Sequence, residues 1–428
     1  KYMFEESIEL SYLQYFIGCI YYSGSYTSTD INKAIFQLVK ASNKKNSKAQ
    51  LLLGVIYYEG KYISPDISKS IYYLTLSADQ NDSSAQFLLG WIYYEGKYIS
   101  RDIKKSIHYF TLSANQNDSR TQFYLGFLYY RSKYISRDIN KSIYYLTLSA
   151  NQNNSKAQFY LGEIYYKGQY ISRDINKSIY YLTLSAYQNN SKAQFYLGEI
   201  YYKGQYISRD INKSIHYFTL SANQNDSDAQ FYLGEIYYLN EYIPQDINKS
   251  IHYLTLSAYQ NNSKAQFYLG VLYYNGKHVS QDINKSIHYF TLSANQNNSN
   301  AQFYIGMLYY LGEYISRDIN KSIKYFTLSA NRSDPYAQCF LGLIYYSGEC
   351  VSRDINKSIH YLTLSAKQNI SDAQCLLGVI YYDNKYIEKD IKKSIHYFKE
   401  SSSFYESVAK NYLGIIYKNG DGVEKNIY

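Results

Sequence analysis

Histidine is the first side chain in this sequence to consider for metal binding. Six of the seven histidines are separated from one another by multiples of 36 residues: His108, His216, His252, His288, His360 and His396. If each occupies the same position in a repeated helix, neighbouring copies stand roughly 10 Å apart. One metal ion, with bond lengths near ~2 Å, cannot bridge that distance. The histidines therefore predict no metal site, and His278 stands alone.

The cysteines and the acidic residues also give no catalytic pattern. Cys19, Cys339, Cys350 and Cys375 have no spacing that would place a disulfide in every repeat. Cys339 and Cys375 are 36 residues apart, in equivalent positions too distant for a bond, so we expect reduced thiols. No acid, base and nucleophile stand together outside the repeated positions. The sequence predicts no enzyme, no catalytic residue and no cofactor.

The glycines show the organisation that positions all of these side chains. One glycine recurs at every 36th position, in twelve copies without insertion or deletion: Gly18, Gly54, Gly90, Gly126, Gly162, Gly198, Gly234, Gly270, Gly306, Gly342, Gly378 and Gly414. A second follows six residues later in nine copies; Asn240 and Asn384 replace it in two others, and Ser132 in one. An unbroken period of this length predicts one repeat array.

Each repeat is expected to contain two helices. Helix A covers residues 155–167, where apolar residues have helical spacing and Gly168 supplies the stop. Helix B begins after Asp174, a capping residue found in eleven of the twelve copies. Gly162 lies inside helix A, where glycine costs about 1 kcal/mol relative to alanine. Its repetition predicts the close approach of a neighbouring helix, so Gly162, Gly168 and Asp174 are expected to be structural.

These positions resemble the Sel-1-like repeat (SLR), a 36-residue relative of the tetratricopeptide repeat. The residues that carry the resemblance, which covers essentially the whole chain, are Ala157, Leu161, Gly162, Tyr165, Gly168, Asp174, Lys177, Ser185 and Ala186. The chain departs from the family at Ser178, where alanine is preferred, and in the connector, where G-x-G-V occurs only at residues 420–423.

The resemblance implies an all-α fold over residues 1–428: a right-handed α-solenoid of about twelve 36-residue helix-turn-helix repeats, with helices A on the concave face. It also implies an adaptor or scaffold for protein complexes. Tetratricopeptide arrays repeat every ~34 residues and RNA-reading pentatricopeptide arrays about every 35, so nucleic acid is not the expected partner.

The copies differ most on one face of helix A. Positions equivalent to 166 are almost always tyrosine and those equivalent to 159 mostly phenylalanine, whereas position 163 varies between apolar and acidic residues. This pattern predicts an aromatic groove with an acidic centre for a protein or peptide, with a basic segment as the best match. The candidate residues are Trp91, Tyr94, Phe127, Tyr130, Phe159, Glu163, Tyr166, Phe195, Glu199, Tyr202, Asp228, Phe231, Glu235 and Tyr238.

Alternative interpretations remain open at this point. Glu163 and Glu199 each precede a lysine by four residues, a pairing common on solvated helices. Lysines three residues after each capping aspartate form a stripe that could bind nucleic acid or an anionic surface, although the aspartates nearly balance its charge. The array could also be the targeting or regulatory arm of a larger, enzymatic chain.

The ends and the compartment receive only broad expectations. The formal charge of +9 is spread thinly, and no apolar run is long enough to cross a membrane. The cytoplasm is favoured, the secretory lumen stays open, and so does glycosylation of the N-x-S sequons. Residues 1–10 form an unassigned lead-in and residues 405–428 an incomplete last repeat. We expect the natural chain to continue past Tyr428.

Overall fold

The computed structural model describes residues 2–26, 28–131, 133–239, 243–277, 279–349, 351–401, 406–422 and 424. In these ranges the regular structure is α-helical, with no strand, which confirms the all-α expectation. The chain divides into two compact units, residues 1–221 and 222–428, and each is described by itself. The expectations for Ser132, Asn240, His278, Cys350 and residues 425–428 lie outside the described residues.

The first unit holds helices α1 to α12, and α12 ends one residue beyond the unit boundary. Their bounds are α1 (Tyr2–Ser23), α2 (Ile31–Asn43), α3 (Ser47–Glu59), α4 (Ile67–Ala78), α5 (Ser83–Glu95), α6 (Ile103–Asn115), α7 (Ser119–Arg131), α8 (Ile139–Asn151), α9 (Ser155–Lys167), α10 (Ile175–Tyr187), α11 (Ser191–Lys203) and α12 (Ile211–Ala222). Helix α1 therefore includes most of the lead-in.

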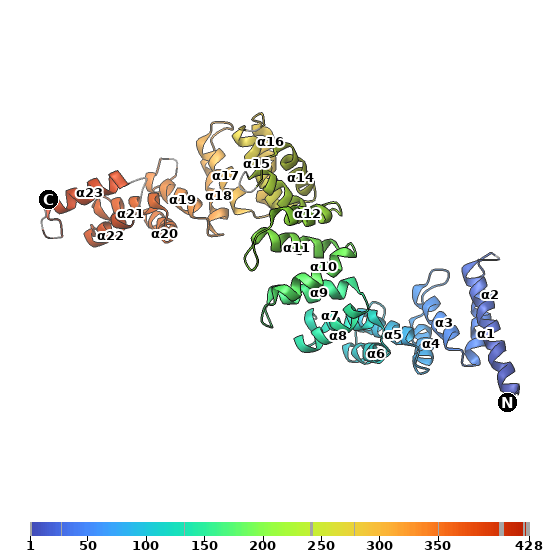
Figure 1. Ribbon diagram of the computed structural model, residues 1–428. Helices are drawn as coiled ribbons and strands as arrows, with labels where there is room; N and C mark the ends of the chain where they lie inside the picture. Colours follow the sequence, from blue (N-terminus) through green and yellow to red (C-terminus); the bar gives the residue numbers. More distant parts are fainter. Residues whose placement is uncertain are drawn as a thin grey trace. The chain divides into compact units, whose positions relative to one another are not determined.

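The second unit repeats the same alternation of helices. Their bounds are α13 (Ser227–Tyr238), α14 (Ile247–Tyr259), α15 (Ser263–Asn275), α16 (Ile283–Asn295), α17 (Ser299–Leu311), α18 (Ile319–Ala330), α19 (Pro335–Ser347), α20 (Ile355–Ala366), α21 (Ser371–Tyr382), α22 (Ile391–Glu400) and α23 (Glu406–Asn419). Odd-numbered helices are helices A and even-numbered ones are helices B, packed in chain order within each unit (Figure 1).

The expected capping residues fix both ends of the helices. All eleven aspartates accept a hydrogen bond at Oδ1 from the backbone N–H three residues later, at 3.0 Å. This bond lowers the pKa of Asp174 below its ordinary value, and the Lys177 charge adds to the effect. Gly168 ends α9 in the left-handed conformation, with φ of 58°. Both expectations for the helix ends are confirmed.

The repeated glycine inside helix A sets the distance to helix B. A Cβ on Gly162 would lie 2.5 Å from Leu182 Cγ, closer than any normal contact. The Ser178 hydroxyl donates a 2.8 Å hydrogen bond to the Gly162 carbonyl, and the same bond recurs in the other repeats that carry this serine. This bond explains the departure from alanine at Ser178. At Gly414, by contrast, no atom of the described residues lies within 4 Å of the added Cβ.

Buried glutamines connect one repeat to the next. The Gln158 amide donates to the Ala150 carbonyl at 3.3 Å, and Gln188 donates to Gln158 Oε1 at 2.7 Å. Equivalent pairs recur along each unit. Position 332 carries arginine instead of this glutamine, and Gln302 Oε1 has no hydrogen-bond partner in the described part of the chain. The repeats are thus joined by polar as well as apolar contacts.

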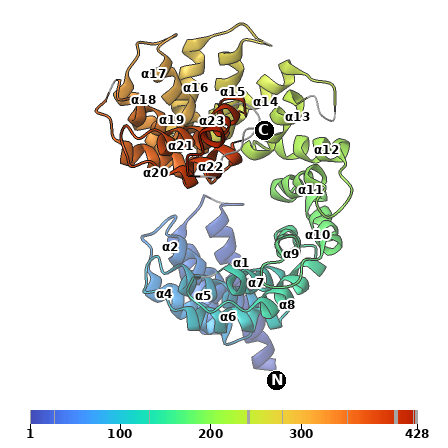
Figure 2. The ribbon, with the colours of Figure 1, turned by 90° about the vertical axis from the view of Figure 1, so that its left-hand side faces the viewer.

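Helices A lie on the inner side of the bend in the first unit. Figure 2 shows α7, α9 and α11 inside and α6, α8 and α10 outside. Consistent with this arrangement, α7 contacts α9, and α9 contacts α11. The variable positions of helix A therefore face a shared inner surface, which we call the helix A surface.

Candidate functional site

The predicted site residues of the first unit lie on α5, α7, α9 and α11, but they differ in exposure. Phe159, Tyr130 and Glu163 are buried. The residues that are half-buried are Trp91, Tyr94, Phe127, Tyr166, Phe195, Glu199 and Tyr202. The buried candidates therefore belong to the packing between adjacent helices A, which we call the wall. The half-buried candidates form the accessible part of the helix A surface.

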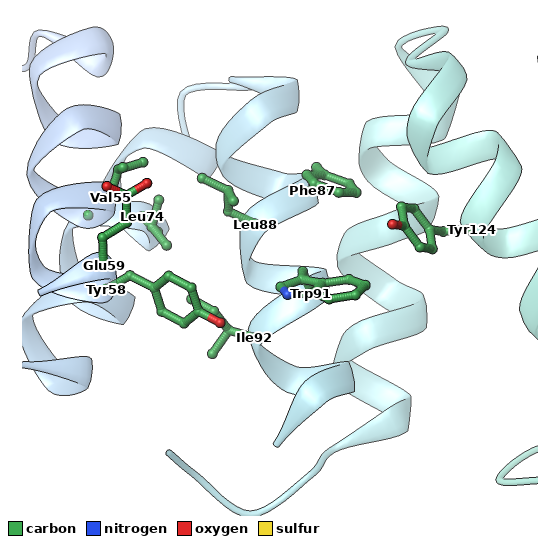
Figure 3. Close-up of a pocket in the computed structure, with 10 residues that line it drawn as sticks. Val55, Tyr58, Glu59, Leu74, Phe87, Leu88, Trp91, Ile92 and Tyr124 are labelled. Carbon is green, nitrogen blue, oxygen red and sulfur yellow. The ribbon is translucent and has the colours of Figure 1, made fainter. Parts of the chain in front are cut away.

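A hollow opens on this surface beside Trp91 (Figure 3). It has a volume of about 300 Å³. The residues that line it, from α3, α4, α5 and α7, are Gly54, Val55, Tyr58, Glu59, Leu74, Phe87, Leu88, Trp91, Ile92 and Tyr124. Tyr58 and Trp91 come from neighbouring helices A and lie close to each other, with Phe87 and Tyr124 beyond Trp91. This Trp91 hollow is mainly apolar and aromatic.

The Trp91 hollow exists because Leu88 is small. The residue at this position in the following repeats is tyrosine: Tyr124, Tyr160, Tyr196, Tyr232, Tyr268 and Tyr304. The Tyr160 ring packs 5.3 Å from the Phe127 ring, and Val55 occupies the position of Phe127 two repeats earlier. Our sequence interpretation followed position 163 and missed Leu88, although its change from the repeated tyrosine was a visible signal.

Glu163 lies two repeats after Trp91, at the same helix position, in a filled environment. Its Oε1 lies 2.6 Å from Arg131 Nη2 and 2.7 Å from Lys167 Nζ, and it accepts a 3.1 Å hydrogen bond from the Tyr196 hydroxyl. The Glu163 side chain is 3% exposed. Its Oε2 has no hydrogen-bond partner among the residues described. Glu163 thus holds three neighbouring side chains within the wall of the unit.

Glu199 is also paired, although it is less buried than Glu163. Its Oε1 lies 2.5 Å from Lys203 Nζ, and its Oε2 accepts a 3.4 Å hydrogen bond from the Tyr166 hydroxyl. Burial, followed by the charge of Glu199, raises the pKa of Tyr166 to about 12. The expected pairs four residues apart are therefore present at both Glu163 and Glu199.

The remaining four candidates belong to the second unit and are described as a separate surface on α13. Phe231 is buried, Glu235 and Tyr238 are half-buried, and Asp228 is exposed. The Tyr268 hydroxyl donates to Glu235 Oε1 at 2.9 Å, and the Asn262 amide donates to Asp228 Oδ1 at 3.0 Å. Phe231 and Glu235 line a hollow of about 620 Å³ that also includes Lys264 and Arg332.

The lysine stripe is balanced within each repeat. In ten repeats the lysine Nζ lies 3.2 to 3.6 Å from the capping aspartate three residues earlier. The same ammonium groups lie over tyrosine rings, for example Lys177 at 5.3 Å from the centroid of Tyr165. The lysines of the stripe therefore pair with the capping aspartates, as expected, and their ammonium groups also lie over tyrosine rings of the same repeat.

The described ranges contain no group of residues arranged as a metal site and no helix suited to span a membrane. No group of three or more histidine, cysteine, aspartate or glutamate residues there is placed to hold a metal ion. Cys19, Cys339 and Cys375 are free thiols, and burial raises the pKa of Cys339 to about 12. None of the described helices has both the length and the apolar character needed to span a membrane.

Comparison with known proteins identifies the repeats. The Sel1 repeat model matches twelve consecutive segments: residues 11–46, 47–82, 83–118, 119–154, 155–190, 191–226, 227–262, 263–298, 299–334, 335–370, 371–403 and 407–428. No curated protein matches the chain.

Two solved structures share this architecture. A protective antigen of uropathogenic Escherichia coli with an SLR fold is 27% identical, with a TM-score of 0.78 over 92% of this chain and 84% of the antigen. A Sel1 repeat protein from Oxalobacter formigenes is 27% identical, with a TM-score of 0.59 over 76% of this chain and 93% of that protein. From the twelve repeat matches we conclude that this chain belongs to the Sel1 repeat family.

Proposed function

We propose that this protein is a non-enzymatic scaffold or adaptor that binds a segment of a partner protein on its helix A surface. Sel1 repeat proteins are in general protein-interaction scaffolds. The observation that carries the proposal is the Trp91 hollow, an apolar space of about 300 Å³ on the inner helices of the first unit. Such a volume lies at the lower end of the range for ligand pockets, roughly 300 to 1,000 Å³.

The composition of the surface favours a polypeptide ligand. Trp91, Tyr94, Phe127 and Tyr166 are half-buried aromatic residues on successive helices A. Tryptophan and tyrosine are enriched among the residues that dominate protein interfaces, because they bury large areas with few rotatable bonds. Phe195 and Tyr202 on α11 extend the same aromatic character. An extended or helical partner segment lying across α5 to α11 would contact this series.

The second unit supplies a separate candidate contact. Asp228, Phe231, Glu235 and Tyr238 lie on α13 and combine aromatic rings with two carboxylates. A basic stretch in the partner would complement these carboxylates. The internal pairing of the lysine stripe gives no comparable support for nucleic acid or an anionic membrane as a partner.

Selection from a random peptide library displayed on phage, against the whole immobilised chain, tests the proposal. We expect enriched peptides whose binding is lost in the double variant Trp91→Ala/Phe195→Ala. The matched control is the triple variant Lys141→Gln/Lys177→Gln/Lys213→Gln, which changes helices B only and should bind the same peptides. Circular dichroism should show the same helix content in all three chains.

Two results would contradict this function. Equal loss of binding in the aromatic and lysine variants would remove the helix A surface as the site. Failure of the wild-type chain to enrich any peptide over an unrelated helical protein would argue against binding of linear segments altogether.

A further inference from the structure

Two carboxylates beside the Trp91 hollow, Glu59 and Glu95, form no ion pair with the described residues. Glu59 lines the hollow and accepts a 3.4 Å hydrogen bond from the Tyr22 hydroxyl. Glu95 accepts a 2.5 Å hydrogen bond from the hydroxyl of Tyr58, which is itself part of the wall of the hollow. Within the described ranges no lysine, arginine or histidine lies within ion-pair distance of Glu59 or Glu95. The two carboxylates therefore lie beside an apolar space without a direct ion pair.

Lys61 and Lys97 interact electrostatically with Glu59 and Glu95 from beyond ion-pair distance. Lys61 and Lys97 lie in the connectors after Glu59 and Glu95, but their ammonium groups lie over the rings of Tyr62 and Tyr98, at 4.9 and 4.7 Å. Glu163 and Glu199, by contrast, each have a cationic group within 2.7 Å. The carboxylates at the ends of α3 and α5 thus differ from Glu163 and Glu199 in having no ion pair among the described residues.

Apolar space and two carboxylates without a direct ion pair together define the chemistry of an occupant. We propose that the Trp91 hollow binds a linear segment of the partner that inserts one large aliphatic or aromatic side chain and places an adjacent lysine or arginine against Glu59 and Glu95. This inference rests on the proposed function and names the residue types that the surface selects. The basic character that the sequence suggested for the ligand is retained, but its position moves from Glu163 to the Trp91 hollow.

The two parts of this recognition should contribute unequally. Burying one large apolar side chain accounts for roughly a 10- to 100-fold gain in affinity. Glu59 is exposed and Glu95 half-buried. Contacts of such surface carboxylates with a basic residue give only about a 2- to 5-fold gain, which salt weakens. The hollow should therefore decide whether a segment binds, and Glu59 and Glu95 should decide which neighbouring residue is preferred.

The substitution Leu88→Tyr tests the role of the apolar hollow by filling it with a larger side chain. It introduces the residue that the next repeats carry, so the helix should be retained while the hollow is filled. We expect binding of wild-type-selected peptides to weaken by at least about 10-fold, in line with the burial of one large side chain. The matched control is Leu376→Tyr, the same change at the equivalent position of α21 in the second unit, and it should bind as the wild type does.

The double substitution Glu59→Gln/Glu95→Gln tests the charged part. Peptides from the same phage library should show a large apolar residue next to lysine or arginine when selected on the wild-type chain. On the double variant, the apolar preference should persist and the basic preference should disappear. Affinity for a wild-type-selected peptide should fall by about 2- to 5-fold in the variant and lose part of its salt dependence.

Different failures separate this inference from the proposed function. Peptides that are lost in Trp91→Ala/Phe195→Ala but lack the paired apolar and basic residues would overturn the inference and leave the function standing. Undiminished binding in Leu88→Tyr would overturn it as well. Enrichment of acidic instead of basic neighbours, on the wild-type chain and on Glu59→Gln/Glu95→Gln alike, would also overturn the inference, because lysines of the surface and not its glutamates would then select the ligand.

Discussion

The environments of Trp91 and Glu163 occupy equivalent places two repeats apart in the first unit, yet one is hollow and the other is filled. Beside Trp91, Leu88 and Val55 leave a space of about 300 Å³. Glu59 also lines this space and forms no ion pair with the described residues. At the equivalent places, Tyr160 and Phe127 pack against each other, and Arg131 pairs with Glu163. A few substitutions on a constant backbone therefore determine whether a repeat presents a pocket or a wall.

The backbone beneath these two environments is the same. A Cβ on Gly90 or Gly162 would lie 2.5 Å from the side chain of helix B in its own repeat. The Ser106 and Ser178 hydroxyls both donate 2.8 Å hydrogen bonds to the carbonyls of those glycines. The repeated positions therefore stabilise the array, and the proposed binding depends on positions that vary between repeats.

The largest effect should come from filling the approach between helices A and B. Gly90→Val and Gly162→Val should each lower the free energy of local unfolding by about 2 to 3 kcal/mol, because overpacking forces neighbouring atoms apart. Hydrogen exchange of the affected repeats provides the measurement. Gly414→Val is the control, because no described residue lies within 4 Å of its Cβ position, and exchange there should be unchanged or slower. A clear difference between Gly90→Val and Gly162→Val would show that the two environments differ in their scaffold as well.

The second effect concerns the buried carboxylate. Glu163→Ala should cost about 2 kcal/mol in local stability, less than a fully buried pair, because the newly unpaired charges can regain water. Arg131 and Lys167 keep 44% and 38% of their side chains exposed. Glu59→Ala, the equivalent loss of a carboxylate at the Trp91 hollow, should change stability by less than about 0.5 kcal/mol. Equal costs in a denaturant or hydrogen-exchange measurement would contradict the distinction between wall and pocket.

A reciprocal exchange gives a smaller effect. Tyr160→Leu should cost about 1 kcal/mol, since it removes a ring that packs on Phe127 and opens a space in the wall. Leu88→Tyr should leave stability unchanged or raise it by a few tenths of a kcal/mol, because it fills an existing space. Thermal unfolding of the two variants beside the wild type measures both changes. Destabilisation by Leu88→Tyr as large as that by Tyr160→Leu would mean that the hollow does not accept the tyrosine of its neighbours.

The smallest effect tests whether the helix starts are equivalent. Backbone hydrogen bonds lower the pKa values of Asp66 and Asp174 in the folded chain, so each carboxylate stabilises it above the unfolded pKa near ~3.9. That contribution is lost as the pH falls through this value toward the lower folded pKa. Asp66→Asn and Asp174→Asn keep a capping group that does not titrate. Circular dichroism during acid titration should therefore show the same slight flattening in both variants, whereas unequal flattening would be a difference between their repeats.

The sequence predicted the elements that repeat and missed the contacts that connect different repeats. The eleven capping aspartates and the glycine stops were predictable because each acts within a few residues of its own position, and Gly162 was predictable because it recurs in every repeat. The burial of Glu163 depends on Arg131 and Tyr196, which lie 32 and 33 residues away in neighbouring repeats. The Trp91 hollow depends on what Leu88 lacks relative to the tyrosine of later copies. The sequence shows this change of residue, but the space that it leaves is seen only when the packing between adjacent helices A is known.

Trp91 is the only tryptophan in the chain, so its fluorescence reports on the hollow directly. The decisive measurement is a titration of the wild-type chain with a peptide selected on it, excited where tyrosine does not absorb. We predict a saturable change in Trp91 emission, toward shorter wavelength as water leaves the indole, with a midpoint equal to the calorimetric dissociation constant. In Leu88→Tyr the midpoints of both the emission change and the calorimetric titration should move to at least about 10-fold higher peptide concentration. Tight calorimetric binding with unchanged Trp91 emission would contradict the assignment of the Trp91 hollow as the binding site.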